Sequence, residues 1–231
     1  MMNITGTILC GFLIGLLLPA IAGRFGKILP ADPGLVLLRL IHFPHFPRAK
    51  NRIHKLRFIK LWMKFVMATL FWGVFVASLF GASDLFILSD FSVWAKIFIT
   101  IICLCIIVDH KYLLLPDFFT IPLLLLGWMM AVYTGFIPVE YSLAGAIFGY
   151  FVSTLSVFVM GLVRSPEFGC GDVKMVTALG AWLGIPGLNF TLILSFLIFA
   201  LSASLSSRRS GPFGPALGLA SLITLFIVFG K

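Results

Sequence analysis

The sequence predicts an all-α, polytopic integral membrane protein, and three observations lead to that class. Hydrophobic residues make up 61% of the 231 residues, and charged residues make up only 11%. The mean hydropathy is +1.13, well above the range of soluble domains. Apolar runs of roughly 17 to 25 residues, the length that crosses a bilayer as a helix, recur along the whole chain. Together these features exclude an ordinary soluble domain.

Seven apolar segments are long enough to cross the membrane. The first has no charged residue before it and no small-residue cleavage site, so we expect a retained helix rather than a removed signal peptide. We expect three regions: a first transmembrane helix at 1–22, a basic cytoplasmic loop at 23–60 and a membrane-embedded domain at 61–231. In chain order the seven segments are 4–22, 61–81, 92–108, 118–136, 141–163, 190–207 and 214–230.

Basic residues predict the orientation, because cytoplasmic loops carry an excess of Lys and Arg. The chain has 17 of them, and most lie in or beside the segment 23–60, which we therefore expect to face the cytoplasm. The acidic segment 82–91 then lies outside, together with the N-terminus. The remaining basic loops agree with this topology of about eight transmembrane segments only if a further, shorter segment, 173–184, also crosses.

The segment 173–184 is too short to cross a bilayer from surface to surface. A helix of this length rises about 18 Å, whereas the hydrocarbon core is about 30 Å thick. We therefore expect it to begin below the membrane surface, with Asp172 at its N-terminus. Irregular backbone at that depth is tolerated only against protein or a water-filled cavity. A wet pocket at the cytoplasmic face is the predicted site.

Asp109 and Asp172 are the candidate catalytic residues. The chain has only eight acidic residues, and carboxylates at membrane depth are costly and usually functional. The predicted topology places both aspartates on the cytoplasmic side at similar depth. Two carboxylates that approach closely do not both ionise easily, so they share a proton and can activate a water while donating a proton. This is the chemistry of an aspartic protease, and it needs no metal.

Two glycines, Gly169 and Gly171, precede Asp172 in the pattern G-x-G-D. Glycine permits positive φ and a close approach of another backbone, so we expect an extended peptide to lie beside this loop. Each feature alone has a simpler interpretation. Asp109 can pair with His110 or Lys111 at the membrane interface, the glycines can form a turn, and the segment 212–215 can be a helix entry with proline in its first turn.

Three motifs occurring together resemble the bacterial type IV prepilin peptidases, which are GxGD aspartic proteases. The motifs are "DHKYLLLPDFFTIPLLLLGW", "FGCGDVKMVTALGAWLG" and "GPFGPALGLA". The resemblance implies that Asp109 and Asp172 form the catalytic pair. We expect Asp117 to cap the next helix instead of joining the pair, because acidic residues satisfy free N–H groups at a helix start. It assigns further residues to the active-site loop and its support, Gly169, Gly171 and Lys174, and others to substrate positioning, Pro212, Phe213, Gly214 and Pro215.

The resemblance implies an endopeptidase of the bacterial inner membrane with its active site facing the cytoplasm. Its substrates would be type IV prepilins or type II secretion pseudopilins, from which it removes a basic leader after a glycine. Membrane lipids are the other expected partners, and no nucleic acid is expected. Two alternatives stay open: a bifunctional enzyme that also N-methylates the new N-terminus, and a non-enzymatic transport protein or secretion scaffold.

The cysteines separate this chain from many members of that family, which bind zinc through two CxxC pairs. Its four cysteines, Cys10, Cys103, Cys105 and Cys170, form no such pair, so we expect no zinc. Proteolysis by two aspartates requires no cofactor. S-adenosylmethionine is expected only if the chain also methylates.

Overall fold

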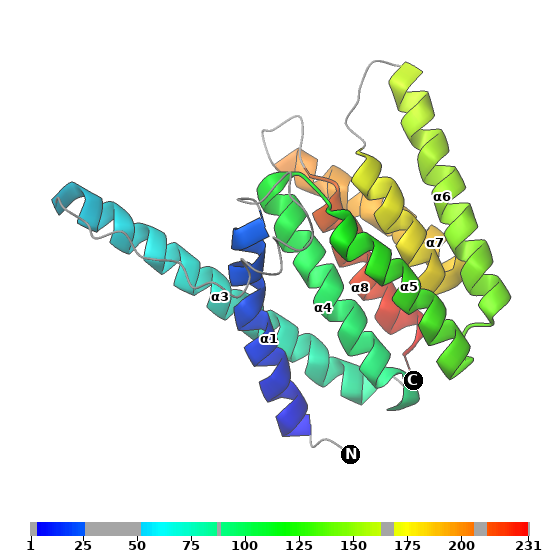
Figure 1. The fold of residues 1–231 in the computed structure, drawn as a ribbon, viewed down its shortest axis with the longest axis horizontal. Helices are drawn as coiled ribbons and strands as arrows, with labels where there is room; N and C mark the ends of the chain where they lie inside the picture. Colours follow the sequence, from blue (N-terminus) through cyan, green and yellow to red (C-terminus); the bar gives the residue numbers. More distant parts are fainter. Residues whose placement is uncertain (1–3, 26–51, 87–88, 163–168, 206–211, 231) are drawn as a thin grey trace. The chain divides into compact units, whose positions relative to one another are not determined.

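The computed structural model describes residues 4–25, 52–86, 89–162, 169–205 and 212–230, which are almost entirely helical (Figure 1). Among these residues, six helices are long and apolar enough to cross a membrane, and α8 is a shorter apolar helix. The predicted class, an all-α polytopic membrane protein, is confirmed. The helices are α1 (Ile4–Phe25), α3 (Arg52–Phe86), α4 (Ser89–Tyr112), α5 (Asp117–Thr134), α6 (Val139–Leu162), α7 (Cys170–Leu205) and α8 (Gly214–Val228).

The helix α3 begins earlier than the sequence suggested. Most of the predicted loop 23–60 lies outside the described residues, but its last part, from Arg52 onward, is already helical. The first 21 residues of α3 contain neither proline nor glycine, and basic and large apolar residues are tolerated well in a helix. The apolar run therefore marks only the membrane part of a longer helix.

The chain divides into two compact units, residues 1–81 and 82–231. In the first unit, α1 packs against α3 through two glycines one turn apart. A Cβ at Gly11 would meet Ala77 and Phe80, and a Cβ at Gly15 would overlap the backbone of Trp72. Small residues at this spacing let two membrane helices approach closely.

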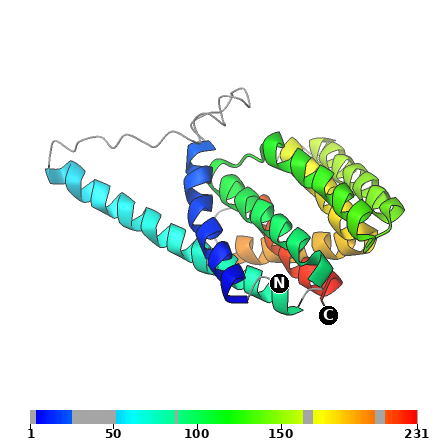
Figure 2. The same ribbon diagram turned by 60° about the horizontal axis from the view of Figure 1, so that its bottom comes forward.

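The second unit contains α4 to α8, and each of these helices contacts at least two of the others. The helix α6 lies beside α7 in both views (Figures 1 and 2). Glycines again make this approach close, since a Cβ at Gly145 would overlap Gly180, and a Cβ at Gly149 would meet the carbonyl of Val176. These contacts fix the register of α6 against α7.

The helix α7 is broken at Gly184, where φ is 66° and ψ is −177°. Pro186 follows, so the backbone cannot continue its hydrogen-bond pattern through this point. The hydroxyl of Ser142 donates a buried hydrogen bond of 2.6 Å to the carbonyl of Ala181, in the turn before the break. The sequence had separated the same region into a short segment, 173–184, and a longer one, 190–207.

The two parts of α7 run in opposite directions between the ends of the second unit. The first part ends at Gly184, close to Tyr141 at the start of α6. The second part returns along α8, where the Thr191 hydroxyl lies 2.9 Å from that of Thr224. Farther along, the ring of Phe199 lies 5.7 Å from that of Phe213. Both ends of α7 therefore lie toward the start of α8.

Candidate active site

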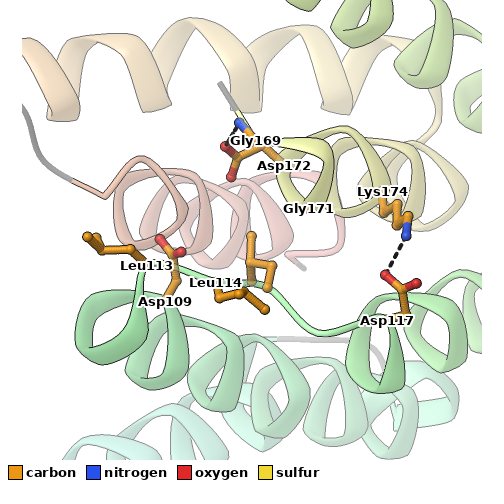
Figure 3. A pocket seen from close by; sticks show the side chains of 9 residues that line it. Asp109, Leu113, Leu114, Asp117, Gly169, Gly171, Asp172 and Lys174 are labelled. Atoms are coloured by element: carbon orange, nitrogen blue, oxygen red, sulfur yellow. Dashed lines mark hydrogen bonds and ion pairs between the residues drawn. The ribbon is translucent and has the colours of Figure 1, made fainter. Parts of the chain in front are cut away.

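The candidate site is a cavity of about 320 Å³ where α4 ends and α5 and α7 begin (Figure 3). It contains both aspartates that the sequence singled out, together with the two glycines and the lysine of the predicted active-site loop. It also contains a segment that the sequence did not single out, between α4 and α5. The lining residues are Asp109, Leu113, Leu114, Leu115, Asp117, Gly169, Gly171, Asp172 and Lys174.

Asp109 lies in the last turn of α4 and is buried, with 6% of its surface exposed. The backbone N–H of Gly214, the first residue of α8, donates a buried hydrogen bond of 3.0 Å to Asp109 Oδ2. The two residues are 105 positions apart. A fourth helix, α8, thus contributes to the site although none of its residues lines the cavity.

Asp172 lies in the first turn of α7 and is 7% exposed. The N–H of Gly169 donates a hydrogen bond of 3.2 Å to Asp172 Oδ2. In return, the Asp172 N–H donates one of 3.0 Å to the Gly169 carbonyl. In a capping box, the side chain of the third helical residue accepts a hydrogen bond from the N–H of the N-cap residue, and Asp172 makes this half of the motif. The three-residue spacing of Gly169 and Asp172 in G-x-G-D therefore matches the spacing of the two capping-box positions at the start of a helix.

The two glycines of the motif differ in what they require. Neither has a positive φ, because among the described glycines only Gly135 and Gly184 do. Of the two properties for which glycine was expected here, positive φ is therefore not used at either position. Gly171 is needed for close approach, since a Cβ there would lie 2.8 Å from the Cβ of Leu115. A Cβ at Gly169 would meet nothing closer than 3.9 Å.

The segment from Leu113 to Pro116 is not helical, and its three leucines line the cavity. Leu113 has a φ of 54°, which an L-residue adopts at a cost of roughly 1 to 2 kcal/mol. Its N–H donates a hydrogen bond of 2.8 Å to the Asp109 carbonyl, which closes the last turn of α4. Leu113 and Leu114 are both exposed at the cavity. Pro116, which disfavours helix at the residue before it, is the sequence signal for this break.

Lys174 contacts Asp117 rather than either buried aspartate. Its Nζ lies 2.5 Å from Asp117 Oδ1, and both side chains are largely exposed. Asp117 is in the first turn of α5, but the N-cap residue is Pro116 and makes no side-chain cap. The expectation that Asp117 caps this helix is therefore replaced by an ion pair between the starts of α5 and α7 (Figure 3).

The motif residues 212–215 form the entry to α8. Phe213 is the N-cap residue, and proline occupies the first turn, as the simpler interpretation of this segment predicted. The Phe213 ring packs between Phe196 and Phe199, with centroid distances of 5.5 and 5.7 Å. Pro212, Phe213, Gly214 and Pro215 do not line the cavity, so substrate positioning by these residues stays a prediction.

The register of α6 against α7 gives the depth of Asp172. Gly145 faces Gly180 and Gly149 faces Val176, so Asp172 lies at the level of Ser153 in the antiparallel register. Ser153 precedes the end of the apolar segment Val139–Val159 by six residues, which is about 9 Å of helix. Asp172 is thus recessed within the apolar length of its neighbour.

Two of the four cysteines lie in α4 and do not line the cavity. Cys103 and Cys105 are buried in α4, and Cys10 is exposed on α1. No group of three or more His, Cys, Asp or Glu residues in the described ranges is placed to hold a metal ion.

Comparison with known proteins relates this chain to one family. Residues 96–204 match the model of the type IV leader peptidase family. A protein of Dichelobacter nodosus is 39% identical over 130 residues, which cover 54% of this chain and 45% of the relative. One of Neisseria gonorrhoeae is 37% identical over 119 residues, covering 50% and 41%. Both relatives are named prepilin leader peptidase/N-methyltransferase.

A third relative, from Pseudomonas aeruginosa, carries the same name and is 39% identical over 128 residues, covering 52% of this chain and 44% of the relative. The chain thus spans less than half the length of these relatives. No solved structure gives a significant match. The matched segment contains Asp109, Asp172 and every other residue that lines the cavity. Over residues 96–204 the chain is similar to the type IV leader peptidase family.

Proposed function

We propose that this chain is an aspartic endopeptidase that removes leader peptides from type IV prepilins or type II secretion pseudopilins. The observation that carries the proposal is the pairing of two buried aspartates, Asp109 and Asp172, on one cavity in the segment that matches the family. They come from separate helices, so the fold, and not a local turn, brings them to one space.

The proposed reaction is hydrolysis of a peptide bond by this pair. The ionised member takes a proton from a water, whose oxygen then attacks the scissile carbonyl carbon, while the protonated member donates its proton to the carbonyl oxygen. The tetrahedral intermediate collapses when the C–N bond breaks and the leaving amine takes up a proton. One proton shared between Asp109 and Asp172 is sufficient for this sequence. The atoms balance with water as the only co-reactant.

The cavity suits a peptide in an extended conformation. Its volume of about 320 Å³ exceeds the space of a single water many times over. The non-helical segment Leu113–Leu115 and the start of α7 both line it, and they touch each other where Gly171 packs against Leu115. A helical substrate would have to unwind locally to present its scissile bond to the two aspartates in this cavity. This requirement favours a substrate that is cut at the end of its own membrane helix.

The proposed location is the bacterial inner membrane, with the cavity at the cytoplasmic face. The segment 23–60, rich in Lys and Arg, supports this orientation by the positive-inside rule. In this proposal residues 61–231 form the peptidase domain, and the cut falls after a glycine at the end of a basic leader. The paired Lys174 and Asp117 line the same cavity and are both largely exposed.

The test is cleavage of a synthetic prepilin by the purified, full-length chain in lipid vesicles. The substrate carries a Lys/Arg-rich leader that ends in glycine, and the new N-terminus is identified by mass spectrometry. We expect wild type to cut after the glycine, and Asp109→Asn and Asp172→Asn to leave the substrate intact. Asp117→Asn is the matched control, because it removes a carboxylate from the same cavity and should retain cleavage. A substrate left whole by wild type overturns the proposal and favours a non-enzymatic role. Equal cutting by wild type and both Asp→Asn variants overturns catalysis by the aspartate pair.

A second activity, N-methylation of the cut product, is favoured by the full name of the relatives. The same mass spectra test it when S-adenosylmethionine is added. A product heavier by one methyl group, formed only in the presence of the methyl donor, is the result expected of a bifunctional enzyme. A cut product of unchanged mass restricts this chain to proteolysis.

A further inference from the structure

The contact between Gly214 and Asp109 joins the start of α8 to the end of α4. It is a buried backbone hydrogen bond of 3.0 Å, and it holds one carboxylate oxygen, Oδ2. The second oxygen is left to exchange a proton with water or substrate. A backbone N–H cannot rotate away as a side-chain donor can, so the bond fixes the orientation of the carboxylate as well as its position.

Glycine is required at position 214 because of this contact. A Cβ built there would overlap Oδ2, Cγ and Cβ of Asp109 at once. The overlap is with the whole carboxylate group, so Asp109 would have to move away from the start of α8, toward the cavity that it lines. Gly214 has no positive φ, so the reason for glycine here is space and not backbone conformation.

The electrostatics of the two helix ends favour the same arrangement. Asp109 lies in the last turn of α4, where the helix carboxyl end makes a negative charge unfavourable. Gly214 is the first residue of α8, and free N–H groups at a helix N-terminus stabilise a nearby negative charge. The start of α8 thus offsets the unfavourable position of Asp109 on its own helix.

The residue before Gly214 anchors the start of α8. Phe213 is buried, and its ring contacts Phe196 and Phe199 of α7. The same helix α7 carries Asp172 at its other end. The position of the Gly214 N–H therefore depends on packing against the element that supplies the second aspartate.

We infer that Gly214 is a positioning residue, whose backbone N–H orients Asp109 for the proposed hydrolysis. The inference rests on the proposed function, and it gives residues 213–214 a role different from direct contact with substrate. It predicts that a change at Gly214 lowers the rate of the chemical step and leaves substrate binding intact.

The kinetic test compares Gly214→Ala with Gly218→Ala in the full-length chain. Both variants add one methyl group to α8, one turn apart, toward α4. The methyl at 218 meets the side chains of Ile102 and Ile106, whereas the methyl at 214 meets the carboxylate. We expect Gly214→Ala to lower kcat about 100-fold with KM unchanged, since a misplacement of about 1 Å can cost this much. Gly218→Ala should retain kcat per folded enzyme. Equal kcat in the two variants, or a raised KM in Gly214→Ala alone, overturns the inference.

A second test needs no variant at Gly214. The chain contains six Phe–Gly pairs, two of which end in Gly169 and Gly214. Protein labelled with carbonyl-¹³C Phe and ¹⁵N Gly therefore gives six selected amide signals in NMR, one for each pair. Asp109→Ala should move the Gly214 proton upfield, as a lost hydrogen bond does, and leave Gly169 in place. Asp172→Ala should do the reverse. If the chemical shift of the Gly214 amide proton does not change in Asp109→Ala, the inference is overturned.

The two tests separate this inference from the proposed function. If wild type does not cut the prepilin, the proposed function fails, and the NMR signals still report whether Gly214 holds Asp109. If wild type cuts the prepilin and Gly214→Ala cuts it at the same kcat, the positioning role alone fails.

Discussion

Lys174 at the start of α7 forms an ion pair with Asp117 at the start of α5, with 2.5 Å between Nζ and Oδ1. The pair spans the rim of a cavity whose two buried aspartates it does not touch. Both partners are exposed, at 44% and 57% of their side-chain surface. Its contribution should therefore be that of a surface ion pair, and its role should be separable from that of the buried carboxylates.

We expect a small coupling energy between Lys174 and Asp117. Exposed ion pairs contribute roughly 0.2 to 1 kcal/mol and weaken in salt. A double-mutant cycle with Lys174→Met and Asp117→Asn, read as the free energy of unfolding in mixed micelles, should give a coupling within this range. Raising the salt concentration to about 1 M, where the Debye length is about 3 Å, should remove it. A coupling of several kcal/mol that is insensitive to salt would contradict this account.

The two motif glycines should respond differently to alanine. Gly171→Ala places a methyl group against Leu115, so the wall Leu113–Leu115 must move away from the start of α7. We expect a clear loss of cleavage activity and a destabilisation of about 1 to 3 kcal/mol, as is typical of overpacking. Gly169→Ala meets open space, keeps the N–H that bonds Asp172, and should retain activity. Equal losses in both variants would mean that the motif acts through something other than this contact.

The two described glycines with positive φ also differ. Gly184 has φ 66° and ψ −177°, a region that is essentially restricted to glycine. Gly135 has φ 60° and ψ 7°, the left-handed helical region that asparagine also adopts. Gly184→Asn should therefore cost about 1 to 3 kcal/mol of unfolding free energy, whereas Gly135→Asn should cost about 1 kcal/mol or less. Thermal unfolding of the two variants, measured side by side, checks the order.

The break in α7 also depends on Ser142. Its hydroxyl satisfies the Ala181 carbonyl in the last helical turn before Gly184. Ser142→Ala should destabilise the protein by about 1 to 2 kcal/mol, because a buried carbonyl loses its partner. Ser156→Ala is a control on the same helix, since the Ser156 hydroxyl bonds only the carbonyl of Val152 within α6. It should change the free energy of unfolding by about 0.5 kcal/mol or less. Equal effects would show that the break needs no support from α6.

Local features of the sequence predicted the helices and the break. An apolar run can be recognised from adjacent residues alone, without knowledge of the tertiary structure. For this reason the spans predicted at 92–108, 118–136 and 141–163 agree with α4, α5 and α6 to within a few residues. The short run 173–184 ended where Gly184 and Pro186 stop the helix. The start of α3 was missed, because hydropathy detects the membrane part of a helix and not its polar extension.

The candidate site was only partly accessible to the same reasoning. Asp109 and Asp172 stood out because carboxylates are rare in so apolar a chain. The bond from Gly214 could not be predicted, since it joins residues 105 positions apart and depends on how α8 packs against α4. The ion pair of Lys174 with Asp117 was missed for the same reason. Their separation in sequence is 57 residues, and charge type alone does not choose a partner.

The reversal of α7 at Gly184 has a consequence for how the protein enters the membrane. The 14 residues from Cys170 to Leu183 rise only about 21 Å, less than the roughly 30 Å of a hydrocarbon core. Such a segment is a poor substrate for insertion as an independent span. We expect the two parts of α7 to leave the translocation machinery together, as one hairpin. This hairpin should enter the lipid only after α6 is in place to pack against it at Gly180. Asp172 would then reach its final depth late in biosynthesis, after α4 has already brought Asp109 into the bilayer.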